Sequence, residues 1–67
     1  MDSLAELSRQ RRKALRLSQA EAAELAGVSE RFVRLVESGK SSVRLDKVQL
    51  LLEVLGLRLR VELRGQS

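Results

Sequence analysis

The chain has 67 residues, of which 13 are Lys or Arg and 9 are Asp or Glu, giving a net charge of +4, and it contains neither cysteine nor histidine. A chain of this length forms one domain with a small core, and its basic balance favours an anionic partner, such as nucleic acid or a membrane surface, over a soluble domain without one. The missing residue types exclude a disulfide framework, thiolate and imidazole metal sites and most acid-base catalysis, so we expect no metal, no cofactor and no enzyme activity.

Neither a membrane-spanning segment nor a secretion signal is evident in the sequence. We therefore expect a cytoplasmic protein, associated with the nucleoid if DNA is its partner. A membrane-surface role is disfavoured, because the arginine-rich first helix lacks an aromatic anchor. Proline is absent, and the glycines fall where periodic segments stop, which divides the chain into helix-sized pieces.

The first predicted helix opens with Ser3-Leu-Ala-Glu6, an S-x-x-E capping box in which each side chain satisfies a backbone N–H that a helix start leaves free. We expect this helix to run to about Arg16. Its apolar residues are compatible with one buried stripe, formed by Leu4, Leu7, Ala14 and Leu15. The run Arg9 to Lys13 has no apolar residue, so it must be largely solvated or paired.

Ser18-Gln-Ala-Glu21 is a second capping box and predicts a helix from about Gln19 to Ala26. Gly27 can adopt the left-handed conformation that ends such a helix at little cost. Small Ala23 allows a neighbouring helix to approach closely. The apolar residues expected where this helix and the next meet the core are Leu25, Val28, Val33 and Val36.

A third helix is predicted from about Glu30 to Ser38, with Ser29 as its cap and Gly39 closing it. Two capped helices with so few residues between them must cross at a steep angle, because the chain has no room to fold back into an antiparallel hairpin. Residues 18–38 therefore have the spacing of a helix-turn-helix.

A fourth helix is predicted from about Leu45 to Leu55, and Gly56 lies just past its end. Its apolar residues recur at three- and four-residue spacing, at Leu45, Val48, Leu51, Leu52 and Leu55. Such a stripe indicates core packing.

With these elements in place, residues 4–56 resemble the DNA-binding domain of the phage-repressor-like, or XRE, helix-turn-helix family. The residues that carry the resemblance are Gln19, Ala20, Glu21, Ala23, Gly27, Val33, Glu37 and Gly39, followed by a helix ending in LGL. The segment VRLDKVQLLLEVLGLRLRVEL, residues 43–63, resembles the HipB-type antitoxin branch. Members of that branch repress transcription and bind a HipA-like kinase toxin, so the resemblance implies such a partner here.

After Gly56 the apolar period changes from 3.6 to 2, because Leu57, Leu59, Val61 and Leu63 alternate with charged residues. This pattern predicts one half-buried strand within a dimerisation segment, 57–64, followed by a tail, 65–67. A lone strand needs a ladder partner, and the chain offers no second strand, so we expect antiparallel pairing with a second copy. The resemblance implies the same. The alternative, an amphipathic extension of the fourth helix, is disfavoured by Gly56 and by the strict alternation.

The start of the third helix is the predicted base-reading surface, formed by Ser29, Glu30, Arg31 and Arg34. A major groove about 12 Å wide accepts one helix whose N-terminal residues meet base edges. Each arginine can bind guanine O6 and N7, and Glu30 can accept from cytosine N4. The alternative for each is a solvated surface charge. Phe32 either touches a thymine methyl or packs, and the role of Leu35 stays open.

Phosphate contacts are expected on both flanks, from Ser18, Gln19, Lys40, Ser41, Ser42 and Arg44. The first two lie at a helix N-terminus, which supplies N–H groups and a favourable dipole, and the resemblance supports Gln19 in particular. The other four lie in the loop after the third helix, for which an ordinary polar loop is the alternative.

The resemblance assigns Arg12 and Glu37 a different role, because the family's arginine at this position pairs with the glutamate at the end of the recognition helix. We interpret the pair as structural. The remaining cations of the first helix region, Arg9, Arg11, Lys13 and Arg16, are interpreted as a solvated basic face that adds nonspecific attraction to DNA.

Together these features predict an all-α fold: a compact four-to-five-helix, repressor-like helix-turn-helix domain, 1–56, with a short C-terminal β-strand that pairs across a homodimer. The predicted function is sequence-specific repression at a pseudo-palindromic operator on double-stranded DNA, with half-sites about 34 Å apart. The resemblance adds the antitoxin role towards a HipA-like kinase. The alternative is a protein-interaction module on the same scaffold that binds DNA only nonspecifically.

Overall fold

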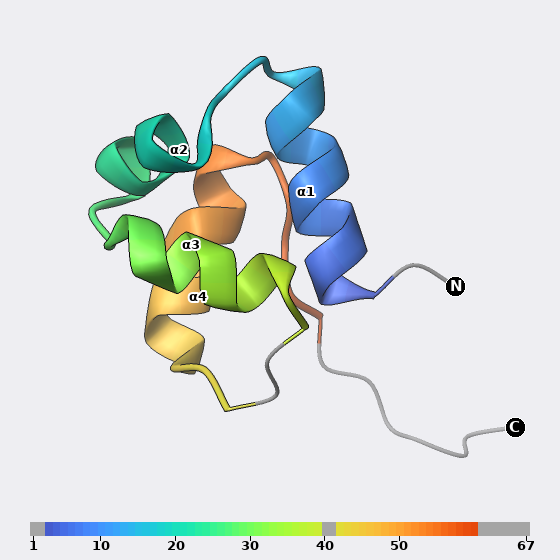
Figure 1. Ribbon diagram of the computed structural model, residues 1–67. Helices are drawn as coiled ribbons and strands as arrows, with labels where there is room; N and C mark the ends of the chain where they lie inside the picture. Colours follow the sequence, from blue (N-terminus) through green and yellow to red (C-terminus); the bar gives the residue numbers. More distant parts are fainter. Residues whose placement is uncertain (1–2, 40–41, 61–67) are drawn as a thin grey trace, which may run out of the picture.

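The computed structural model describes residues 3–39 and 42–60, which form four helices (Figure 1). These are α1 (Leu4–Ala14), α2 (Gln19–Ala26), α3 (Glu30–Glu37) and α4 (Leu45–Val54). The predicted all-α class is confirmed, and the described part of the chain contains no strand. No helix in these residues is long and apolar enough to cross a membrane.

Serine side chains start the first three helices, as the sequence predicts. The Oγ of Ser3 accepts from the N–H of Glu6 at 3.1 Å, and the Oγ of Ser18 accepts from the N–H of Glu21 at 3.0 Å. Only the second capping box is reciprocal, because the Glu21 carboxylate also accepts from the backbone N–H of Ser18 at 2.8 Å. These local bonds satisfy donors that the short helices would otherwise leave free.

The end of α1 lies two residues before the predicted end, at Ala14 rather than Arg16. Arg16 adopts a left-handed conformation with φ +59°, which reverses the chain. The N–H of Leu17 then donates to the carbonyl of Arg12 and that of Arg16 to Lys13, each at 3.0 Å. This is the hydrogen-bond pattern with which glycine commonly ends a helix, here formed around an arginine.

The core lies between α2, α3 and α4, with α1 packed against α3. Its buried residues are Ala22, Ala23, Ala26, Phe32, Val33, Val36, Val48, Leu51, Leu52 and Leu55. Phe32 is only 8% exposed, so of the two roles left open it packs in the core and does not reach a thymine methyl in the DNA major groove. Val28 packs partly against the same cluster, as predicted.

Several predicted core positions are wrong. Leu25 and Leu45 are 64% and 62% exposed, and the predicted leucine stripe of α1 leaves Leu4, Ala14 and Leu15 exposed. The buried face of α1 is formed instead by Ala5 and Ser8. These two residues lie on the same helical face as Arg12, and their small side chains let α1 approach its neighbours while Arg12 reaches α3.

After α4 the chain runs back alongside α1 (Figure 1). The N–H of Leu57 donates to the carbonyl of Leu52 at 2.8 Å, and Leu57 packs partly against the core. Residues 57–60 have no regular secondary structure. Val61 and Leu63 lie outside the described residues, so the dimerisation strand stays a prediction.

A buried hydroxyl on α1 provides a test of the packing. Ser8 is fully buried, and its Oγ has no hydrogen-bond partner among residues 3–39 and 42–60. Because an unpaired buried hydroxyl is unfavourable, Ser8→Ala should raise the free energy of unfolding by about 1 kcal/mol. Urea unfolding followed by circular dichroism measures this change.

Gln10→Ala, at an exposed position of the same helix, is the matched control for helix propensity and should gain only a few tenths of a kcal/mol. A loss of stability in Ser8→Ala would mean that the hydroxyl has a favourable partner.

Candidate nucleic-acid interface

One side of α3 packs and the other faces solvent. Phe32, Val33 and Val36 enter the core, whereas Glu30, Arg31 and Arg34 are exposed, and Ser29 caps the helix with an Oγ that accepts from the N–H of Phe32 at 3.0 Å. The predicted base-reading residues therefore share the solvent side of a helix whose opposite side is held by the core. A side chain in this position is free to enter a major groove.

Arg34 pairs with Glu30 one turn earlier, with 3.0 Å between Nη1 and Oε2. Both side chains are exposed, and an exposed pair at this spacing contributes only about 0.3–0.5 kcal/mol. DNA can therefore displace it at little cost. Arg31 takes part in no ion pair within the described residues. Leu35 is half-buried.

The start of α2 carries hydrogen-bond donors on its backbone and on the side chain of Gln19. The backbone N–H groups of Gln19 and Ala20 lie in the first turn, where a helix supplies no acceptor for them. The side-chain amide of Gln19 donates to Oε1 of Glu37 at 3.2 Å, which uses one of its two hydrogens. Gln19 can thus contact a phosphate while it remains fixed to α3.

The loop after α3 is described only in part. Ser42 is exposed, and Arg44 pairs with Asp46 at 2.8 Å between Nη2 and Oδ2. The hydrogen bond from Arg44 lowers the pKa of Asp46. Lys40 and Ser41 lie outside the described residues, so the phosphate contacts of this loop stay a prediction.

Arg12 and Glu37 form a bidentate ion pair between α1 and α3. The distances are 2.6 Å from Nε to Oε2 and 3.1 Å from Nη2 to Oε1, and the side chains are 12% and 7% exposed. The remaining Nη1 of Arg12 donates to the carbonyl of Leu17 at 2.8 Å. With the Gln19 amide on Glu37, one network joins α1, the following turn, α2 and α3.

The network also keeps its two charges at neutral pH. Burial raises the pKa of Glu37. The hydrogen bonds from Arg12 and Gln19, together with the positive charges of Arg12 and Arg9, outweigh this effect, so the net pKa of Glu37 lies below its ordinary value. The hydrogen bond to Glu37 raises the pKa of Arg12. Since both groups stay ionised, the pair persists through the physiological range.

Arg11 has a role that the sequence interpretation missed. It is predicted to be part of a solvated basic face, but its Nε donates to the carbonyl of Leu55 at 2.9 Å. A cation at a helix C-terminus is favourable because the last carbonyls carry partial negative charge. Arg11 thereby fastens the end of α4 to α1. Local sequence patterns carry no signal for a bond between residues so far apart.

Comparison with known proteins matches most of the chain to one family model, described as helix-turn-helix, over residues 9–61. The matched range contains α2, α3 and α4 complete, together with the part of α1 that carries Arg12. A search of curated proteins found no match.

The pH dependence of stability tests the buried pair. Glu37→Gln removes the carboxylate charge, so at neutral pH it should lower the free energy of unfolding by about 1.5–3 kcal/mol, the range for hydrogen bonds to charged groups. Because folding lowers the pKa of Glu37, the wild-type advantage should be complete above the ordinary value near 4.5 and should disappear as the pH falls through the lower folded value.

Urea unfolding of the wild type and of Glu37→Gln between neutral pH and about pH 2 measures the difference in their free energies of unfolding. The other carboxylates are common to both chains, so their contributions cancel in this difference. A wild-type advantage that stayed constant into acid would contradict an ionised, paired Glu37.

Proposed function

Because the chain belongs to the XRE-type helix-turn-helix family of DNA-binding transcription regulators, we propose that it is a sequence-specific repressor that binds its operator as a homodimer in the cytoplasm. The observation that carries this proposal is the solvent side of α3, where Glu30, Arg31 and Arg34 stand on a helix that is capped by Ser29 and held by the core. A rigid helix with this face suits direct readout of base edges.

Positioning on the duplex comes from the flanks of α3. Ser18 and Gln19 at the start of α2 contact phosphate on one side, and the loop containing Lys40, Ser41, Ser42 and Arg44 contacts it on the other. The free N–H groups at the start of α2 and the exposed side chains of Ser42 and Arg44 support these roles. Phosphate contacts fix orientation, whereas Arg31 and Arg34 supply the sequence preference.

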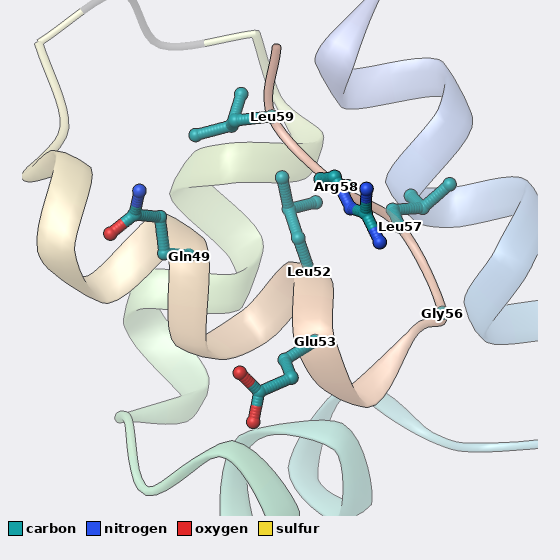
Figure 2. A pocket seen from close by; sticks show the side chains of 7 residues that line it. All are labelled: Gln49, Leu52, Glu53, Gly56, Leu57, Arg58 and Leu59. Atoms are coloured by element: carbon teal, nitrogen blue, oxygen red, sulfur yellow. The ribbon is translucent and has the colours of Figure 1, made fainter.

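Dimerisation places two α3 helices in successive major grooves, with half-sites about 34 Å apart on a pseudo-palindromic operator. A hollow of about 500 Å³ beside α4, here called the α4 hollow, supports the C-terminal segment as the contact surface (Figure 2). Its lining includes Leu52 of α4 and Leu57 and Leu59 of the segment that follows. Leu59 is 37% exposed there, so a partner's segment 57–64 has apolar surface to cover.

The finer assignment is an antitoxin paired with a HipA-like kinase toxin. Its support is the resemblance of residues 43–63 to HipB-type proteins, and formation of a stable complex with such a kinase is its direct test. Repression and dimerisation do not depend on this assignment, because they rest on α3 and on the C-terminal segment.

The readout proposal predicts different effects on specific and nonspecific DNA. Selection from a random duplex library at roughly physiological salt should enrich a two-fold symmetric motif. On that motif, Arg31→Ala and Arg34→Ala should each weaken binding by about 1–3 kcal/mol and relax the preference at the base they contact, as fluorescence anisotropy can measure.

Lys47→Ala is the matched control, because Lys47 is a cation of α4 outside the α4 hollow, and it should leave the ratio of specific to nonspecific affinity unchanged. Equal losses on every duplex for the α3 variants would favour the protein-interaction module instead.

The dimer proposal predicts that a charge on the α4 hollow separates the two copies. Leu59→Arg should shift the sedimentation velocity profile towards monomer, because it replaces an apolar side chain of the proposed contact with a charge that loses its water on burial. Leu25→Arg, at an exposed leucine of α2, is the control and should remain dimeric. Unaltered sedimentation of Leu59→Arg would refute this contact surface.

A further inference from the structure

A second hollow lies between α1, the start of α2 and the second half of α3, with a volume of about 440 Å³. It is named here the basic hollow, and its lining includes Arg9, Arg12 and Lys13 of α1, Gln19 of α2, and Arg34 and Glu37 of α3. Four of these side chains are cationic and one is anionic. Three helices thus bring an excess of positive charge to one concave surface.

The partners of these charges determine what remains available. Glu37 is paired with Arg12 in the buried ion pair, and Arg34 is paired with Glu30. Arg9 and Lys13 are exposed, and neither takes part in an ion pair within residues 3–39 and 42–60. Two cations therefore line the hollow without a salt bridge to a carboxylate, and Glu37, whose charge Arg9 also attracts, is already paired with Arg12. The excess of positive charge favours binding of an anion from outside the chain.

The position of the hollow indicates which anion. It shares Gln19 with the start of α2 and Arg34 with the solvent side of α3, so its opening adjoins the surface proposed to enter the major groove. The DNA strand that borders the major groove would bring its backbone phosphates next to the basic hollow. Lysine meets such a group as a point charge, and arginine meets it with a planar fork of donors.

We propose that Arg9 and Lys13 bind a backbone phosphate of the DNA beside each half-site, with the Gln19 amide at the same hollow as a further donor. This inference rests on the proposed function and extends the phosphate-contacting set to α1. The two residues set affinity and position on the duplex, and they carry no base preference.

The salt dependence of binding tests the proposal. For the double variant Arg9→Ala/Lys13→Ala, the slope of log K against log salt concentration on the selected duplex should become shallower by about 0.9 for each phosphate that the protein no longer neutralises, hence by about 1.8 in a dimer. The enriched motif should be the same as for the wild type. The charge-conserving variant Arg9→Lys/Lys13→Arg should retain the wild-type slope, and Lys47→Ala, at a cation of α4 that lines neither hollow, should retain it as well.

Urea unfolding of the double variant guards against a structural explanation, because Arg9 also acts on the pKa of Glu37. If the double variant is folded and its slope is unchanged, the inference about Arg9 and Lys13 is wrong. The proposed function is unaffected by that result as long as the wild type enriches a motif. If the wild type enriched no motif, the proposed function would fail, and the same slopes on a mixed-sequence duplex would still decide the role of the hollow.

Inorganic phosphate distinguishes the DNA backbone from a free anion as the ligand. Titrated into the wild type at constant ionic strength, it should produce no saturable shift in the amide resonances of residues 9–13. Saturable binding that the double variant abolished would assign the hollow to free phosphate and overturn the assignment to DNA.

Discussion

The buried pair of Arg12 and Glu37 is the interaction on which the arrangement of this domain depends. Helices of eight residues, such as α2 and α3, are marginal in isolation, so their orientation must come from contacts with other elements. Arg12 joins the C-terminal end of α3 to α1 and to the carbonyl of Leu17, while Gln19 joins it to α2. Truncating one partner of such a pair to alanine, which unlike glutamine leaves no hydrogen-bonding group in its place, costs on the order of 3–5 kcal/mol, because a buried charge is left alone. The pair therefore joins α3 to the rest of the domain in the orientation observed.

Because of this constraint, the cations of α1 have two different roles. On α1, Arg12 and Arg11 make bonds inside the protein, to Glu37 and to the end of α4, whereas Arg9 and Lys13 remain exposed at the basic hollow. The division follows the helical period, because Arg12 shares a face with the small buried residues Ala5 and Ser8. One short basic run thus serves both stability and, in our proposal, attraction of DNA.

Local signals predicted the helices well and the packing less well. Ser18, Ser29 and Gly27 act within one turn of their own positions, so the bounds of α2 and α3 follow from the sequence to within one residue. The burial of Ala5 and Ser8 in place of a leucine stripe, the exposure of Leu25, and the bond from Arg11 to Leu55 depend on how distant helices meet. Periodicity cannot distinguish these outcomes. The dimerisation strand requires a second chain, and of its apolar residues only Leu57 and Leu59 are described.

The solvent side of α3 and the start of α2 form, in our proposal, the DNA-binding surface. Nuclear magnetic resonance titration of the isotope-labelled protein with the selected duplex tests this claim most directly, because every backbone amide reports its own environment. We predict the largest shift changes at residues 29–34 and at Gln19, with little change at Gln49 and Glu53 of the α4 hollow. Changes concentrated on α4, with α3 unaffected, would contradict the proposed surface.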